Sequence, residues 1–150
     1  MTISVIGLNH KSANIDIRGK FSFTADSASL LLRRIKKVRD IHEVIVVSTC
    51  NRTEIYCEST NGADDIKNWL LAEREYKSFA KHLYIHQEED AIEHLFKVVA
   101  GLDSMVIGES EVLGQVKTAY KTALENKSIE GKLKRLFEYS FSVAKNVRTN

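Results

Sequence analysis

The order of the apolar patterns is the feature that most constrains how this chain can fold. Up to His86, short runs of β-branched residues alternate with stretches whose apolar side chains recur at helical spacing, whereas almost every stretch from Glu88 onward favours helix. The first part therefore predicts four strands and two helices in the order β-α-β-β-α-β. We expect an α+β fold in which a sheet lobe over residues 1–86 is followed by packed helices over residues 87–150.

The predicted elements of the sheet lobe form the split pattern of a ferredoxin-like sheet. Thr24 or Asp26 is suited to cap the first helix, and Asp64 or Asp65 to begin the second. Residues 9–20 are polar and predict a loop. The four predicted strands cover residues 2–8, 43–48, 52–58 and 83–85.

The balance of charges excludes a polycation, since 22 Lys and Arg residues face 20 Asp and Glu residues for a net charge of +2. Any nucleic-acid contact must therefore come from a local basic patch. The two cysteines, Cys50 and Cys57, and an N-terminus unlike a secretion signal favour a reducing, cytoplasmic setting over a disulfide framework. No apolar stretch approaches the ~18 residues required to cross a membrane, so we expect no membrane contact.

Basic side chains gather on two of the predicted helices. Most such runs are solvated helix faces, and a contact with phosphate groups is the alternative. The clusters are Arg33, Arg34, Lys36, Lys37 and Arg39 on the first helix, and Lys127, Lys132, Lys134, Arg135, Lys145 and Arg148 toward the end of the chain.

Cys50 is the candidate nucleophile. It lies between two predicted strands and is flanked by Thr49, Asn51 and Arg52, whereas a buried structural cysteine is expected among aliphatic neighbours. A catalytic thiol requires a lowered pKa or an adjacent base, together with access to substrate. Arg52 supplies a nearby positive charge, and the strand end supplies exposure. An inert cysteine at a strand end is the alternative that these residues leave open.

A reactive cysteine in an intracellular enzyme usually works with a histidine from elsewhere in the chain. His94 is a candidate because it lies on a predicted helix directly before an unusual polar segment. Its position also fits an ordinary helix histidine that hydrogen-bonds to solvent or to a carbonyl group. The other histidines are His10, His42, His82 and His86.

Residues 101–117 form that segment, in which glycines interrupt an apolar frame and several polar side chains project. The segment matches neither Gly-x-Gly-x-x-Gly nor the Gly-Lys-Ser/Thr phosphate loop, so a nucleotide site of a familiar kind is excluded. A plainer interpretation has Ser110 as a helix N-cap and Gly108 as a hinge between two helices. The polar side chains are those of Asp103, Ser104, Glu109, Glu111 and Gln115.

Taken together, these residues resemble the glutamyl-tRNA reductase family, specifically its N-terminal catalytic domain. Residues 7–13 are similar to the N-terminal motif of that family, and residues 48–56 are similar to the motif around its nucleophile. Residues 94–117 are similar to its long signature segment, and residues 141–149 to the stretch that leads into its next domain.

The resemblance implies that Cys50 attacks the ester carbonyl of glutamyl-tRNA to give a thioester, which NADPH reduces to glutamate-1-semialdehyde for tetrapyrrole (porphyrin) synthesis. It also implies that His94 takes part in this activity and that Arg52 binds the glutamate side-chain carboxylate bidentately. The chain departs from the family at Asn14, where a proline is usual, and at Ser110-Glu111, where Pro-Gln is usual. The implied substrate-binding residues are Thr49, Asn51, Arg52, Ser104, Glu109, Ser110, Glu111 and Gln115.

The same resemblance implies a longer protein, in which an NADPH-binding Rossmann domain and a helical dimerisation domain follow along a long helix. We expect residues 1–150 to be the catalytic domain alone, without a bound cofactor. Residues 1–86 would carry the nucleophile, and residues 87–150 would complete the substrate pocket and start the linking helix. The implied partners are glutamyl-tRNA, a second copy of the full-length chain and the next enzyme, an aminomutase. The alternative function is a non-catalytic α+β module that binds tRNA or a protein through its basic helices.

Overall fold

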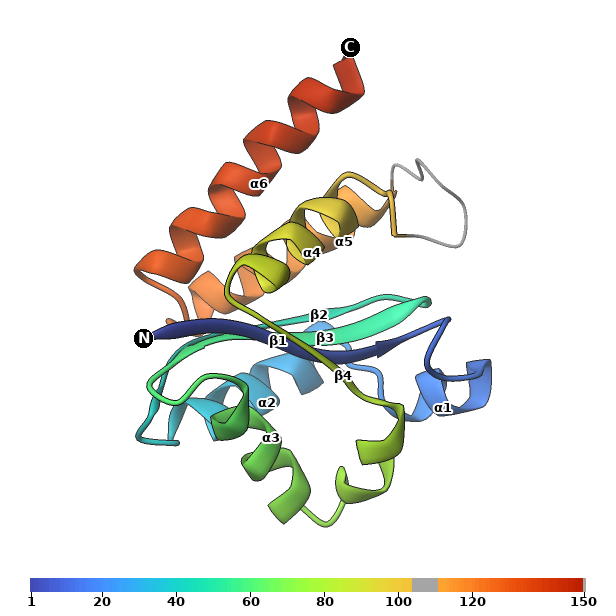
Figure 1. Ribbon diagram of the computed structural model, residues 1–150, viewed down its shortest axis with the longest axis vertical. Coiled ribbons are helices and arrows are strands. Elements are labelled where there is room, and N and C mark those ends of the chain that lie inside the picture. Colours follow the sequence, from blue (N-terminus) through green and yellow to red (C-terminus); the bar gives the residue numbers. More distant parts are fainter. Residues whose placement is uncertain (104–110, 150) are drawn as a thin grey trace.

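The computed structural model describes residues 1–103 and 111–149 and has a four-stranded antiparallel sheet at its centre (Figure 1). The sheet order β2-β3-β1-β4 is that of a split β-α-β-β-α-β unit, so the predicted α+β fold is confirmed. The strands are β1 (Thr2–Asn9), β2 (Ile41–Ser48), β3 (Arg52–Ser59) and β4 (Tyr84–Gln87). The helices are α1 (Ile15–Lys20), α2 (Ala25–Lys36), α3 (Ala63–Ala72), the 3₁₀ helix η1 (Lys77–His82), α4 (Glu89–Val99), α5 (Glu111–Glu125) and α6 (Lys132–Thr149).

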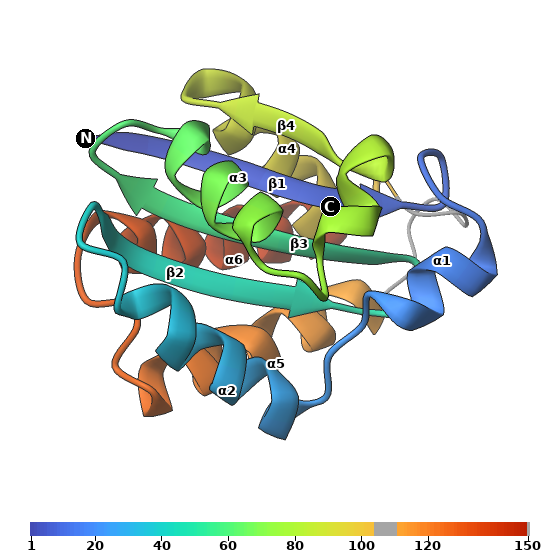
Figure 2. The same ribbon diagram turned by 90° about the horizontal axis from the view of Figure 1, so that it is seen from below.

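Helices cover both faces of the sheet. α2 and α3 lie against one face, whereas α4, α5 and α6 lie against the other, as Figures 1 and 2 show from two directions. β2 and β3 are buried along almost their whole length because they lie between the two helical layers. None of the described helices is long and apolar enough to cross a membrane.

Side-chain caps define where the first two helices begin. Thr24 and Ser27 form a reciprocal capping box at the start of α2, which confirms Thr24 as a predicted cap. The polar stretch before α2 contains α1 rather than only a loop, so the loop prediction was wrong there. The cause is Asn14, whose side chain accepts a hydrogen bond from the Ile17 backbone N–H at 3.0 Å and so starts a short helix.

A buried carboxylate fastens the start of α6 to the sheet. Glu43 on β2 is 4% exposed, and its side chain accepts hydrogen bonds from backbone N–H groups in and just before the first turn of α6. The donors are Glu130 and Gly131, each at 2.8 Å, Leu133 at 2.9 Å and Lys134 at 3.4 Å. Burial would raise the pKa of Glu43, but these amide hydrogen bonds outweigh burial and lower the pKa.

Candidate active site

Cys50 is exposed in the tight connection between β2 and β3. Hydrogen bonds order this connection: the Thr49 N–H donates to the Arg52 carbonyl at 2.8 Å, and the Asn51 N–H donates to Thr49 Oγ1 at 3.2 Å. Arg18 of α1 donates to the Cys50 carbonyl oxygen at 3.3 Å and so ties α1 to the turn. The thiol therefore has access to solvent on an ordered turn, with two predicted site residues, Thr49 and Asn51, directly beside it.

Arg52 is buried at the start of β3, directly after the cysteine turn, with a side chain that is 1% exposed. Its guanidinium donates to Glu54 Oε2 at 3.2 Å, to Asp103 Oδ2 at 3.1 Å and to the Asp103 backbone carbonyl. Burial would lower the pKa of Arg52, but the charge of Glu54 and other nearby groups outweigh burial and raise it. Arg52 pairs with two protein carboxylates in this structure, and its role in binding a substrate carboxylate stays a prediction.

Glu54 lies at the centre of a hydrogen-bonded cluster on the sheet face that α4–α6 cover. Its side chain has no exposed surface, and Oε1 accepts a hydrogen bond from the Tyr56 hydroxyl at 2.8 Å. Oε2 accepts from Arg52 and from the Tyr84 hydroxyl on β4, and it is hydrogen-bonded to Nε2 of His94 on α4. Burial would raise the pKa of Glu54, but the hydrogen bond with His94 and the charges of His94 and Arg52 outweigh burial and hold the pKa to about 2.

Gly7 on β1 has no side chain and so leaves room for the residues of this cluster. The strand register pairs Gly7 with Glu54 on one side and with Tyr84 on the other, so these residues form a row across the sheet. A Cβ atom at Gly7 would lie 2.5 Å from the Thr53 carbonyl oxygen and 2.8 Å from Glu54 Cγ. A glycine at this point therefore leaves room for the Glu54 side chain, which accepts a hydrogen bond from the Tyr84 hydroxyl on the other side of β1.

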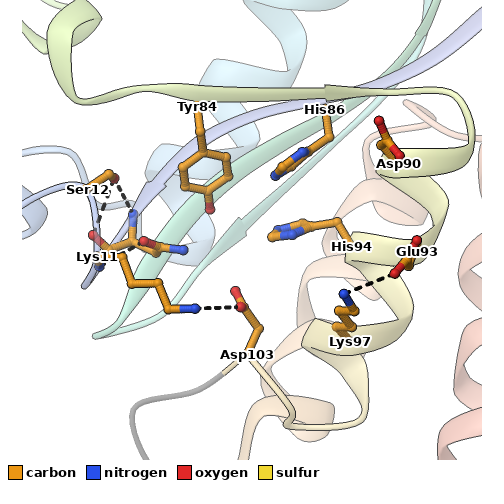
Figure 3. Close-up of a pocket in the computed structure, with 10 residues that line it drawn as sticks. Lys11, Ser12, Tyr84, His86, Asp90, Glu93, His94, Lys97 and Asp103 are labelled. Atoms are coloured by element: carbon orange, nitrogen blue, oxygen red, sulfur yellow. Dashed lines mark hydrogen bonds and ion pairs between the residues drawn. The ribbon is translucent and has the colours of Figure 1, made fainter.

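A pocket of about 520 Å³ lies beside the cluster, and Figure 3 shows the side chains that line it. His86 on β4 stacks on His94 with the ring centroids 4.6 Å apart. Burial lowers the pKa of His86, and the neighbouring charge of His94 lowers it further. The lining residues, which carry charges of both signs, are Asn9, Lys11, Ser12, Tyr84, His86, Asp90, Glu93, His94, Lys97 and Asp103.

The predicted site residues do not all come together. Cys50 lies on the β2–β3 turn and does not line the pocket that contains His94. Gln115 on α5 lines a second hollow of about 70 Å³, together with Ser48 at the end of β2. Glu111 is exposed at the start of α5. Three further predicted residues, Ser104, Glu109 and Ser110, lie outside the described residues.

Sequence reasoning missed Glu54, Tyr84 and Gly7 as members of the site. The available signal was a glutamate in the middle of a strand, because a charged side chain on a face that helices cover requires buried partners. Tyr84 and His94 lie 30 and 40 residues farther along the chain than Glu54, so no local pattern points to them as those partners.

Several described side chains in this region carry reactive or charged groups. They provide an exposed thiol, an imidazole hydrogen-bonded to a buried carboxylate, and charged groups around a pocket. Within residues 1–103 and 111–149, no group of three or more His, Cys, Asp and Glu side chains is arranged to hold a metal ion. The sequence also has no glycine-rich dinucleotide loop.

Comparison with known proteins points to one family. The family described as "Glutamyl-tRNAGlu reductase, N-terminal domain" matches residues 6–150. The chain is 43% identical to glutamyl-tRNA reductase of Idiomarina loihiensis and 44% identical to that of Xylella fastidiosa, over 99% and 100% of this chain and 36% and 34% of those proteins. It therefore spans about a third of the length of these relatives. The solved structure of glutamyl-tRNA reductase from Methanopyrus kandleri shares the fold, with a TM-score of 0.75 and 24% identity over 98% of this chain and 34% of that one.

Proposed function

The chain belongs to the family of glutamyl-tRNA reductase N-terminal domains, and we propose that it performs the step in which a cysteine attacks glutamyl-tRNA. The observation that carries this proposal is the exposed thiol of Cys50, which an ordered turn holds directly before the buried Arg52. An exposed thiol on an ordered turn is accessible to a large substrate, which is what attack on a carbonyl carbon requires. The names of the curated relatives, which share 43–44% identity with the chain, support glutamyl-tRNA as the substrate.

In the proposed step, the Cys50 thiolate attacks the ester carbonyl carbon that joins glutamate to the terminal ribose of the tRNA. A carbon–sulfur bond forms, the carbon–oxygen bond to the ribose breaks, and the ribose oxygen leaves with a proton. The thiol supplies this proton overall, so the products are a glutamyl thioester on Cys50 and free tRNA.

His94 is proposed to move the proton, since an imidazole both accepts and donates protons near neutral pH. It lines the pocket and is held there by Glu54 and by the stacked ring of His86. The pocket lining includes both basic and acidic side chains, for example Lys97 and Asp90. This mixture matches a glutamyl group, which carries an ammonium and a carboxylate.

Arg52 is proposed to bind the side-chain carboxylate of the substrate. Its guanidinium already pairs with Glu54 and Asp103, so a substrate carboxylate would bind by displacing one of them. Asp103 is the exchangeable partner, because its side chain is 17% exposed whereas that of Glu54 is fully buried. The other proposed substrate contacts are Thr49, Asn51, Ser104, Glu109, Ser110, Glu111 and Gln115.

For the longer protein, we propose that NADPH reduces the thioester to glutamate-1-semialdehyde, a precursor of tetrapyrroles. The present residues do not fit this cofactor, because the chain lacks a Gly-x-Gly-x-x-Gly motif, and we assign no reduction step to them. We also propose that the longer protein is a cytoplasmic homodimer and that it contacts an aminomutase. Within the present chain, we propose that residues 1–86 carry the thiol and that residues 87–150 complete the pocket.

Incubation of the chain with tRNA that carries labelled glutamate tests the thiol step. The wild-type chain is expected to form a labelled acyl-protein and to release tRNA, whereas Cys50→Ser forms no thioester. Cys57→Ala is the matched control and is expected to keep the adduct, because Cys57 is fully buried and burial raises the pKa of its thiol. Equal deacylation by the wild-type chain and Cys50→Ser, without an adduct, would contradict the thiol role and favour a non-catalytic binding module.

A further inference from the structure

Glu54 has no path to a substrate, but some of its partners do. Its carboxylate is fully buried, and its oxygens are occupied by Tyr56 on Oε1 and by Arg52, Tyr84 and His94 on Oε2. Tyr84 and His94 line the pocket, and the His94 side chain is 10% exposed. Burial raises the pKa of Tyr84, and an arginine does not give up its proton, so any contribution of Glu54 to proton transfer passes through His94.

The surroundings of Glu54 dictate where His94 carries its hydrogen. An ionised carboxylate only accepts hydrogen bonds, and a pKa of about 2 keeps Glu54 ionised at neutral pH. Nε2 is the His94 atom that contacts Oε2, so Nε2 must be the donor. When the imidazole is neutral, a hydrogen on Nε2 leaves Nδ1 as the nitrogen with a free lone pair.

Packing keeps the His94 ring in this orientation, and Figure 3 shows the three rings together. His86 stacks on His94 with an interplanar angle of 29°, and the Tyr84 ring meets His94 at its edge with centroids 5.6 Å apart. Rotating the His94 ring by half a turn would place a C–H group against the Glu54 carboxylate, which would then lose a charge-assisted hydrogen bond.

We propose that Glu54 is a positioning residue that keeps a hydrogen on Nε2 of His94, so that Nδ1 is the nitrogen that takes up and releases protons in the pocket. Glu54 can act in this way only if His94 moves a proton during acyl transfer, so the assignment rests on the proposed function. Gly7 is part of the same arrangement, because a Cβ atom there would meet the Glu54 side chain at 2.8 Å.

Side-chain ¹⁵N–¹H correlation spectra of the wild-type chain test the assignment directly. At a pH where His94 is neutral, Nε2 is expected to carry the hydrogen and Nδ1 to give the resonance of an unprotonated nitrogen. The His94→Asn variant identifies the His94 signals among those of the five histidines. A neutral His94 that carries its hydrogen on Nδ1 would overturn the proposal without any variant of Glu54.

The Glu54→Leu variant provides a second test, since it keeps the approximate size of the side chain and removes both acceptor oxygens. Arg52 keeps Asp103 as a partner, but no acceptor remains beside Nε2 of His94 to favour a hydrogen there. The Nε2–H form is then no longer the sole neutral species, and acylation of Cys50 falls about a hundredfold or more. An unchanged tautomer with an unchanged rate in Glu54→Leu contradicts the proposal.

Tyr56→Phe is the matched control for this variant. It removes the donor that contacts Oε1 and leaves the partners of Oε2 in place. We expect it to retain the Nε2–H form of His94 and most of the acylation rate. A shift of the His94 hydrogen in Tyr56→Phe as large as that in Glu54→Leu would assign the effect to general loosening of the cluster and overturn the specific role of Glu54.

Failure of this assignment can be told apart from failure of the proposed function. If the wild-type chain forms no adduct on Cys50, the proposed function fails, whichever nitrogen of His94 carries the hydrogen. If the adduct forms while His94 carries its hydrogen on Nδ1, the function stands and only the role of Glu54 fails.

Discussion

Glu43 on β2 and Glu54 on β3 are buried glutamates on neighbouring strands, and different kinds of group stabilise the two carboxylates. The pKa of each is lowered, although burial alone would raise it. Glu43 is stabilised by backbone N–H groups at the start of α6. Glu54 is stabilised by the side chains of Arg52, Tyr84 and His94.

The difference lies in what each set of partners can do. Backbone amides do not exchange protons with a ligand or change rotamer, so Glu43 is suited to hold a helix in place. An imidazole can gain and lose a proton near neutral pH, so the partners of Glu54 can take part in a reaction. We infer that Glu43 contributes mainly to stability, and that Glu54 contributes to activity through His94.

The acylation rates of Glu54→Leu and Glu43→Gln test this comparison most severely. We expect Glu54→Leu to lower the rate of adduct formation on Cys50 about a hundredfold or more, because His94 loses its fixed tautomer. Glu43→Gln is expected to leave the rate nearly unchanged, because none of its partners lines the pocket. Quenched-flow measurement of labelled adduct gives both rates. Equal losses of rate in the two variants would show that the two glutamates do not differ in their contribution to activity.

The free energy of unfolding should respond most strongly at Glu43. Glu43→Ala leaves several backbone N–H groups at the start of α6 without their acceptor, which should cost about 3 kcal/mol at pH 7. A carboxylate with a lowered folded pKa stabilises the fold above its ordinary pKa of 4.5, and this contribution is lost as the pH falls through the folded value. The difference between variant and wild type in urea unfolding should therefore shrink below pH 4.5, and a constant difference would contradict the ionic cap.

Gly7→Ala tests the space that the Glu54 cluster requires. The new Cβ would lie 2.5 Å from the Thr53 carbonyl oxygen, so we expect a loss of about 2 kcal/mol in stability together with a slower acylation rate. Gly19→Ala is the matched control, since a Cβ there would meet no described atom within 4 Å beyond its chain neighbours and its own helix backbone, and the substitution should be neutral or slightly stabilising. Thermal melts compare the two variants, and equal melting temperatures would show that β1 accommodates the methyl group.

Glu58→Gln should have the smallest effect on the free energy of unfolding, and it should stabilise the fold rather than destabilise it. Burial and the nearby charge of Glu43 raise the pKa of Glu58, so the fold favours its protonated form. That stabilisation is present below the ordinary pKa of 4.5 and is lost as the pH rises through the raised value. A neutral glutamine should therefore stabilise the fold slightly at pH 7 and leave its stability unchanged in acid. A variant that is less stable than wild type at pH 7 would show that Glu58 is ionised and paired.

Local sequence patterns were sufficient for most of the fold. The strands and the helix that Thr24 caps follow from side-chain periodicity and capping, which act over a few residues. α1 was missed because its stretch is polar and has no apolar periodicity, and a single hydrogen bond from Ile17 to the Asn14 side chain starts it. A helix this short offers too few residues for a pattern to emerge.

The candidate site was predictable only where residue type alone was informative. Cys50 and His94 were identifiable because a thiol and an imidazole have few equivalents in protein chemistry. The position of Arg52 between two carboxylates was not, because Asp103 lies 51 residues away along the chain. The row formed by Gly7 with the strands on either side depends on sheet register, and one residue of slip would remove it.

The carboxylate that caps α6 also has a mechanical consequence. α6 contains 18 residues, and it runs from its start at the sheet toward the C-terminal end of the structure (Figure 1). At 1.5 Å per residue the helix is roughly 27 Å long, so a tilt of about 5° at its base would move its far end by about 2 Å. Glu43 lies at the fixed end of this helix, because it holds the first turn to β2. A small change in how this side chain holds the first turn would therefore produce a much larger displacement at the C-terminal end of α6.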